Sequence, residues 1–241
     1  MISVIIPVYN TPKELKKCLE SLAGQTFRDP SEIADGSHGV NFEVIVVDDG
    51  SNPAINTNIC KEPLNIKWFR IEHGGAGRAR NFGFQQSRGE FVLFCDADME
   101  LRKDCLQKMF TALKNNPAKA YAYSDFKYGW KIFYLWNFDA EKLKKNNYIS
   151  VCSLLRREDF LGFDQSLKRF QDWDLWLSLL EKEKAGVYIP EVLFKASTAS
   201  GNISLWLPKI FYKFSFLKRV KEYEKARAII LKKHSINLPF N

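Results

Sequence analysis

Two aspartates separated by one residue, Asp96 and Asp98, are the residues of this 241-residue chain that are most clearly suited to chemistry. They follow the apolar run Phe91–Cys95, which has the length and composition of a buried strand. On a tight turn, both carboxylates could face one hard cation, because Mg²⁺ and Mn²⁺ take oxygen ligands and commonly share substrate phosphates. We therefore expect a metal–diphosphate site that uses Mn²⁺ or Mg²⁺. The alternative is a simple turn, in which such residues are also common.

Two other segments contain residue types that commonly contact nucleotides. The Asp-Asp-Gly-Ser run 48–51 follows the apolar run 42–47, so one of its carboxylates could accept a hydrogen bond from a nucleobase N–H, although these are also ordinary turn residues. The glycine-rich run 74–80 precedes a predicted helix whose first N–H groups could hold phosphate. Within it, Arg78 and Arg80 could contact donor phosphates or lie on a solvated helix face. A dinucleotide fingerprint is not supported, because Arg80 occupies the place of the third glycine and the segment lies in a late strand–helix unit.

A third acidic group opens a helix late in the chain. Asp172 and Asp174 stand at the start of a predicted amphipathic helix, 172–181. Aspartate is a favoured helix cap, so one acid could cap the helix while the other faces the cleft. A carboxylate there could act as a general base toward an acceptor hydroxyl. Nucleophilic hydrolase chemistry has no support, because the chain lacks a Gly-x-Ser-x-Gly elbow and its three histidines are scattered.

The segments that must position these groups alternate between strand and helix. The pattern predicts strands at 2–7, 42–47, 67–71, 90–95 and 121–123, and helices at 12–22, 78–87, 106–113 and 172–181. This order indicates an α/β fold with a mostly parallel central sheet flanked by helices. Ligands of such sheets bind at the carboxyl ends of the strands. That edge would carry Tyr9, Asp48, Asp49, Asp96 and Asp98.

Composition limits the function classes. Hydrophobic residues make up 46% of the chain, which is enough for a packed core. The net charge is +8, and residues 209–233 hold nine Lys or Arg against two Glu. The rest of the chain is close to neutral, which argues against a nucleic-acid-binding core. The five cysteines form no CxxC pair, so we expect free thiols and a reducing compartment. No apolar run reaches the about 20 residues of a membrane span, and the first strand begins at Ile2, which leaves no signal peptide before it.

Taken in order, these motifs resemble the family 2 glycosyltransferases of GT-A fold. The resemblance covers about residues 1–200 and is carried by the segments Ser3–Asn10, Val46–Ser51, Gly77–Asn81, Asp96–Asp98, Gly162–Asp164 and Gln171–Leu175. It implies an inverting transferase that moves a sugar from a nucleotide-diphosphate sugar to an acceptor hydroxyl with a divalent cation. It also implies a place in glycan or cell-surface polysaccharide synthesis.

The resemblance also implies roles for individual residues. Tyr9 would stack on the nucleobase and Asp49 would hydrogen-bond it. Asp98 would bind the metal with the help of Asp96, and Asp172 would be the catalytic base. The full donor-binding set is Pro7, Tyr9, Asp49, Gly77, Arg78, Arg80 and Asp96.

The chain departs from the family pattern at two places. Gln171 stands where relatives carry Glu, which removes a charge beside the base. Residues 194–200 lack an Arg-x-His stretch, so Lys195 is the remaining candidate there for a phosphate contact.

We expect three parts along the chain: a nucleotide-sugar-binding half at 1–125, an acceptor-binding half with the base at 126–200, and a basic helical tail at 201–241. Apolar residues recur at helical spacing between Leu207 and Val220. Such a helix could lie on an anionic membrane through residues 203–233 or pack on the catalytic domain. The acceptor would be a saccharide or a lipid-linked sugar. The protein would be cytoplasmic, with peripheral contact at the inner face of the cell membrane if the tail binds lipid.

Two rival functions follow from the same residues. A sugar-nucleotide nucleotidyltransferase would share the sheet and the cation, but it should carry a glycine-rich basic loop directly after the first strand, and residues 7–13 offer none. A non-catalytic nucleotide-sugar-binding module is the second rival. The complete set of acids argues against it.

Overall fold

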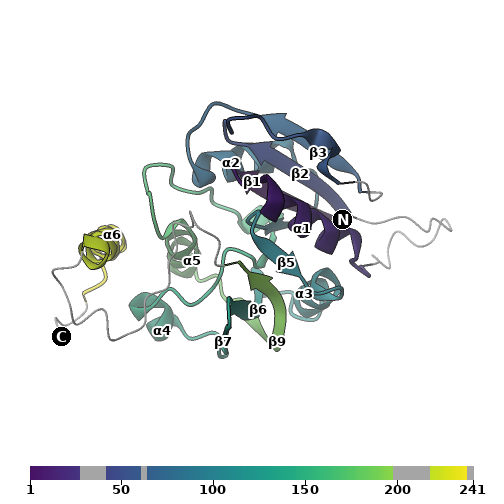
Figure 1. Ribbon diagram of the computed structural model, residues 1–241. Helices are drawn as coiled ribbons and strands as arrows, with labels where there is room; N and C mark the ends of the chain where they lie inside the picture. The colour runs from purple at the N-terminus through teal and green to yellow at the C-terminus, as the bar shows by residue number, and fades with distance from the viewer. Residues whose placement is uncertain (28–41, 61–63, 198–217, 238–241) are drawn as a thin grey trace.

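The strands of this chain form a single curved sheet. The computed structural model describes residues 1–27, 42–60, 64–197 and 218–237. Within these ranges nine strands pair in the order β3-β2-β1-β4-β8-β6-β9-β5, and β7 pairs with β6 (Figure 1). Their bounds are Ile2–Val8 (β1), Phe42–Asp48 (β2), Ile66–Arg70 (β3), Phe91–Phe94 (β4), Met99–Leu101 (β5), Tyr121–Tyr128 (β6), Lys131–Phe133 (β7), Leu154–Arg156 (β8) and Gly186–Ala196 (β9).

The helices are Pro12–Ala23 (α1), Ala76–Gln86 (α2), Cys105–Lys114 (α3), Ala140–Lys145 (α4), Gln171–Glu181 (α5) and Lys218–Lys233 (α6), with short 3-10 turns at Thr57–Ile59 and Arg157–Asp159. Helices α1, α2 and α3 flank the sheet and contact its strands. Helix α2 lies close against β1, since a Cβ added at Gly83 would stand 2.5 Å from a methyl carbon of Ile5. The expected α/β architecture, a mostly parallel sheet flanked by helices, is confirmed.

The first half of the sheet is wholly parallel. Strands β3, β2, β1 and β4 pair side by side in the same direction. Every residue of β1, β2 and β4 is buried, as expected of strands that helices cover on both faces. The continuous apolar runs that predicted these three strands reflect that two-sided burial.

The second half mixes directions but keeps the same edge for its longest strands. Strand β8 runs antiparallel to both β4 and β6, so β6 runs in the direction of β4, and β9 is parallel to β6. The carboxyl ends of β1, β2, β4, β6 and β9 therefore lie at one edge of the sheet, here called the carboxyl edge. Strand β5 is antiparallel to β9 and begins at this edge.

The tail contains one described helix. Helix α6 lies beside α5 (Figure 1), and Lys233 at its end bonds to Asp174 of α5 at 3.0 Å. The predicted amphipathic stretch from Leu207 to Val220 falls almost wholly on residues 198–217, outside the described residues. None of the helices that the structure describes is long and apolar enough to cross a membrane.

The cysteines are unpaired, as predicted. All five are free, and all except Cys60 are buried. Cys18 and Cys95 place their sulfur atoms 3.7 Å apart in the core between α1 and the end of β4. This contact and burial raise the pKa of Cys18 well above its usual value, so these thiols act as apolar packing groups.

Candidate active site

Asp96 and Asp98 occupy the turn that joins β4 to β5 at the carboxyl edge. The Met99 N–H closes this turn on the Asp96 carbonyl at 3.0 Å. The backbone of Asp98 is held from the other side, because the Ser197 N–H at the end of β9 donates to its carbonyl at 3.0 Å. Both aspartates are partly exposed, so their carboxylates are accessible from the edge of the sheet.

Arg80 connects this turn to two helices. From α2, its buried guanidinium donates to Asp96 Oδ1 at 2.5 Å and to Gln171 Oε1 at 3.0 Å. It also lies over the ring of Phe163, 5.2 Å from the ring centre. The alternative that Arg80 faces solvent is therefore wrong, since the side chain is 8% exposed. Arg78, in contrast, is exposed at the start of α2.

Gly77 allows α2 and α5 to approach closely. It is buried in the first turn of α2. A Cβ at this position would stand 2.7 Å from the side-chain nitrogen of Gln171. Gly77 and Arg80 thus fix the start of α2 against the start of α5, which carries Asp172.

Asp49 binds the glycine-rich loop of its own chain. The carboxylate is 2% exposed and accepts the N–H groups of Gly74 and Gly75 at 2.9 and 2.8 Å. His73 Nδ1 lies 2.9 Å from its second oxygen. The N–H groups of Gly74 and Gly75 are therefore used within the chain, and the prediction that the run 74–80 holds phosphate stays a prediction for the N–H groups that follow them. The turn interpretation holds for Asp48, whose carboxylate accepts the Ser51 N–H at 2.8 Å.

Tyr9 lies at the end of β1, beside this loop. Its side chain is 46% exposed, and its ring stacks on that of His73 with centres 4.1 Å apart. Pro7 is buried within β1 opposite Val47 of β2. Tyr9 therefore offers an accessible aromatic ring at the carboxyl edge, whereas Pro7 helps to fix the strand that carries it.

Asp172 lies in the first turn of α5, but it does not cap the helix. The capping position belongs to Phe170, which adopts left-handed backbone angles of φ 61° and ψ 28° without a side-chain cap bond, a conformation that is strained for a bulky residue. The prediction that Asp172 or Asp174 caps α5 is wrong for this reason. Asp174 is buried and faces α6, where it pairs with Lys233 and His234.

The environment of Asp172 opposes the ionised form on balance. Burial raises the pKa of its carboxyl and outweighs the hydrogen bonds from Asn147 and Trp173, which lower it. The charge of Arg80 lowers this pKa, and the charge of Asp96 raises it. These influences mean that Asp172 shares one electrostatic site with Arg80 and Asp96. A general base needs such a position, since its pKa must approach the working pH.

Asn147 is a site residue that sequence analysis missed. Its Nδ2 donates to Asp172 Oδ1 at 3.0 Å. It follows α4, in the polar run Lys144–Asn147 that begins in the last turn of that helix, and such a polar run ordinarily indicates solvated residues. Lys195, the candidate phosphate contact, instead pairs with Glu100 at 2.8 Å.

The residues on the turn fit a shared cation. Three or more His, Cys, Asp or Glu side chains arranged to hold a metal are not found in the described ranges. Mg²⁺ and Mn²⁺, however, are commonly held by one or two carboxylates together with substrate phosphates. Asp98 and Asp96 provide those two carboxylates on one accessible turn, so the donor set suits a cation that a diphosphate completes.

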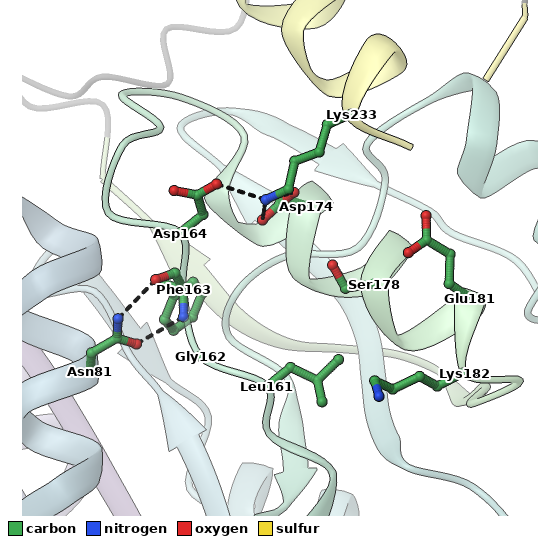
Figure 2. Close-up of a pocket in the computed structure, with 10 residues that line it drawn as sticks. All are labelled: Asn81, Leu161, Gly162, Phe163, Asp164, Asp174, Ser178, Glu181, Lys182 and Lys233. Carbon is green, nitrogen blue, oxygen red and sulfur yellow. Dashed lines mark hydrogen bonds and ion pairs between the residues drawn. The ribbon is translucent and has the colours of Figure 1, made fainter. Parts of the chain in front are cut away.

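One hollow of the described surface lies away from these residues. A pocket of about 640 Å³ opens between α5, the loop 161–164 and the end of α6. In Figure 2, Lys233 reaches from α6 toward Asp164 and Asp174, and Asn81 forms two hydrogen bonds with the backbone of Phe163. Neither Asp98 nor Asp172 lines this pocket, so we do not assign the donor to it.

Comparison with known proteins shows the family of the chain. Residues 3–171 match the family described as glycosyl transferase family 2. An uncharacterized glycosyltransferase of Rickettsia conorii is 28% identical over 200 residues, which cover 77% of this chain and 31% of that protein. The chain spans less than a third of the length of the curated relatives that head the comparison.

Two solved structures share the fold. TarS 1–349 of S. aureus in complex with UDP-GlcNAc matches with a TM-score of 0.67 and 22% identity over 97% of this chain and 72% of that one. The mannosyltransferase PcManGT from Pyrobaculum calidifontis, in complex with GDP-Man and Mn²⁺, matches with a TM-score of 0.59 and 14% identity over 99% and 76%. At these identities the similarity establishes a GT-A type fold.

Proposed function

This chain belongs to glycosyl transferase family 2, and on that premise we propose that it moves a sugar from a nucleotide-diphosphate sugar to an acceptor hydroxyl with inversion of configuration. The observation that carries the proposal is the single electrostatic site formed by Asp172, Arg80 and Asp96. It combines a half-buried carboxylate, suited to proton transfer, with a turn that offers carboxylates to a cation.

Asp172 is the proposed base. Its Oδ1 accepts hydrogen bonds from Asn147 and from the Trp173 N–H, so the second oxygen would take the acceptor proton. The hydroxyl then attacks the anomeric carbon opposite the diphosphate. This is a single displacement, which inverts the configuration and needs no covalent enzyme nucleophile.

Asp98, with Asp96, would hold Mn²⁺ or Mg²⁺. When bound, such an ion stabilises the negative charge that develops on the leaving diphosphate. Arg80 fixes Asp96 through its ion pair, so the orientation of this carboxylate does not depend on the donor.

The donor base would bind at the end of β1. Tyr9 offers its exposed ring for stacking, and Arg78 at the start of α2 would contact a phosphate. Asp49 contributes by holding Gly74 and Gly75 in place. A direct hydrogen bond to the base would use a remaining lone pair of its oxygens.

The proposed acceptor is a saccharide or a lipid-linked sugar, in glycan or cell-surface polysaccharide synthesis. A Staphylococcus aureus relative, TarS, is named poly(ribitol-phosphate) beta-N-acetylglucosaminyltransferase, and this name supports a polymeric acceptor as the general class. We propose a cytoplasmic location with peripheral membrane contact through residues 203–233, and no nucleic-acid partner.

Thermal unfolding in the presence of UDP-GlcNAc, GDP-mannose and the free nucleotides, each with and without Mn²⁺, tests donor binding. We expect one donor to raise the melting temperature in a Mn²⁺-dependent manner. Asp98→Ala should remove the Mn²⁺-dependent part. Glu90→Ala is the matched control, because Glu90 is exposed and precedes β4 at its opposite end.

The rivals predict different results. A nucleotidyltransferase would consume a nucleoside triphosphate and a sugar phosphate and release pyrophosphate. A binding module would show the Mn²⁺-dependent shift without donor hydrolysis or transfer. An unchanged response of the Asp98→Ala variant would contradict the proposed metal site.

A further inference from the structure

The contact between Asn147 and Asp172 fixes the proposed base. Asn147 Nδ2 donates to Asp172 Oδ1 at 3.0 Å, and the Trp173 N–H donates to the same oxygen at 2.9 Å. Two donors on one oxygen hold the plane of the carboxyl group. Among the described residues no hydrogen bond to Oδ2 is formed, so this oxygen is left for a substrate proton.

Two hydrogen bonds hold the segment that carries Asn147 against α5. Trp173 Nε1 donates to the carbonyl of Leu143 at 2.7 Å, and Trp176 Nε1 donates to the carbonyl of Ile149 at 3.0 Å. Both indoles are buried. Asn147 lies between these two anchored carbonyls, so the helix that presents Asp172 also fixes the position of its hydrogen-bond donor.

The unpaired oxygen of the Asn147 amide indicates that the useful part of this side chain is its N–H donor. Its Oδ1 is buried and has no hydrogen-bond partner in the parts of the chain that the structure describes. Unpaired buried polar atoms are rare, and an apolar side chain of the same size would avoid this one. Turning the amide over would place its oxygen against the carboxylate, so the nitrogen must face Asp172.

Outside α5, three parts of the chain supply the polar and charged groups that act on Asp172. Arg80 lies on α2, Asp96 on the turn between β4 and β5, and Asn147 between α4 and β8. Only Asn147 and the Trp173 N–H donate hydrogen bonds to the carboxylate. The donor of Asn147 is thus the only hydrogen bond to Asp172 from outside α5 in the described structure.

We propose that Asn147 is the positioning residue of the base: it holds Asp172 Oδ1 so that Oδ2 faces the acceptor hydroxyl, and its N–H stabilises the ionised carboxylate that must take the proton. This inference rests on the proposed function of Asp172 as the base.

Three variants test the proposal. Asn147→Leu removes the donor at similar volume, and Asn147→Asp keeps the shape but faces the base with a second carboxyl group. Asn146→Leu is the matched control, because the neighbouring side chain is exposed. Circular dichroism and thermal unfolding establish which variants fold. If the Leu variant does not, the Asp variant carries the test.

One readout follows turnover. With UDP-GlcNAc or GDP-mannose, whichever binds, we expect donor affinity with Mn²⁺ to be unchanged in both Asn147 variants. We expect kcat for donor hydrolysis to fall about 10- to 100-fold, as is typical when a hydrogen-bond partner that orients a functional residue is removed. We also expect the acid limb of the pH profile of kcat to move to higher pH. The Asn146→Leu control should match the wild type.

A second readout does not need activity. Carboxyl carbon-13 NMR of labelled aspartate, with the Asp172 signal assigned by its loss in Asp172→Asn, follows the titration of this group directly. We expect the midpoint to rise in both Asn147 variants, because a donor to the ionised form lowers a pKa. Equal midpoints and equal kcat in wild type and folded variants would overturn the proposal.

The two readouts separate the two claims. A wild-type protein that binds no nucleotide sugar and turns over none would overturn the proposed function, while the titration would still report whether Asn147 acts on Asp172. A donor-active wild type whose Asn147 variants keep both kcat and titration would leave the function intact and remove Asn147 from it.

Discussion

The Asp172 carboxyl is subject to opposing influences. Burial and the charge of Asp96 raise its pKa, whereas Asn147, the Trp173 N–H and Arg80 lower it, and the net direction is upward. Since a base must be ionised, the rate should rise with pH through a midpoint above the usual value of about 3.9 for aspartate. A kcat/KM profile for transfer checks this, and a profile that is flat from pH 4 to 7 would contradict it.

Replacing this group separates catalysis from stability. For Asp172→Asn we expect transfer to fall by about 10² to 10⁴-fold with donor affinity retained. An acid with a raised folded-state pKa costs stability above that pKa, and this cost vanishes below the unfolded-state pKa of about 3.9. The Asn variant should therefore melt higher than wild type at pH 7 but not at pH 3.5. Thermal unfolding at both pH values and a transfer assay measure this. Retained turnover would remove Asp172 from its role.

Arg80 is the residue on which the geometry of the site depends most. Arg80→Met removes the buried partner of Asp96 and the hydrogen bond to Gln171. Breaking a buried pair typically costs 3–5 kcal/mol. Because the Asp96 side chain is 33% exposed and remains partly hydrated, we expect about 2 kcal/mol in urea unfolding. Arg78→Met, two residues earlier on α2 and exposed, should change stability by about 0.5 kcal/mol or less. Equal effects of the two substitutions would contradict the structural role of Arg80.

These residues show which parts of a site a sequence reveals. Asp96 and Asp98 were located correctly at the carboxyl edge because they directly follow a continuous apolar strand. The burial of Arg80 was not foreseen, because its partners Asp96 and Gln171 lie 16 and 91 residues away and a charged residue on a helix usually faces water. Asn147 gave no signal, since its importance arises from where α5 places Asp172.

At the scale of elements, the strands buried on both faces were predicted nearly to their ends. Strand β3 and the start of β6 were predicted as well, whereas β5, β7, β8 and β9 were not. Strands β1, β2 and β4 are fully buried runs. Strand β9 was missed because it contains Pro190 and Glu191, and because its burial follows neither a continuous nor an alternating pattern. Strand β8 has only three residues, which is too short for a periodic pattern. The pairing of these strands is set by long-range packing that local sequence does not encode.

The attachment of α6 to α5 is an electrostatic latch. His234, with its side chain 3% exposed, bonds to both Asp174 and Glu181, and Lys233 joins Asp164 to Asp174. Burial lowers the pKa of His234, but the two carboxylates outweigh it and the net pKa is raised. The bonds of Lys233 and Ser166 lower the pKa of Asp164 to about 2. The latch therefore contains a charged pair, Lys233 with Asp164, at neutral pH.

The sign of the His234 shift predicts how α6 responds to pH. A histidine whose folded-state pKa is raised adds stability that is complete below the unfolded value of about 6.5 and is lost as pH rises through the folded value. Hydrogen exchange across residues 218–237, corrected for intrinsic rates, should show protection falling as pH rises above 6.5, about tenfold for each unit of pKa difference. His234→Gln should lower protection at pH 6 and flatten this dependence. A wild type whose protection does not change between pH 6 and 9 would contradict the latch.

At the scale of the whole molecule, the positive charge is concentrated in one region. The net charge is +8, and residues 209–233 contain nine Lys or Arg. On α6, Lys233 is committed to Asp164 and Asp174, whereas Lys218, Lys221 and Lys225 are exposed. The latch thus holds one end of a helix whose other lysines remain accessible, and packing on α5 is compatible with contact to an anionic surface.

Co-sedimentation with vesicles that contain an anionic phospholipid decides whether this surface binds membrane. We expect the full chain to bind at low ionic strength and to dissociate as salt shortens the Debye length. Each cation near such a surface contributes about 1 kcal/mol, so replacing Lys218, Lys221 and Lys225 with Gln should weaken partitioning roughly 100-fold. Replacing Lys13, Lys16 and Lys17 of α1, which are equally exposed, removes the same charge elsewhere and should have little effect. If both triple variants lose the same share of vesicle binding, the binding depends only on net charge and not on α6. If the wild type does not bind vesicles, α6 is a helix that only packs on α5.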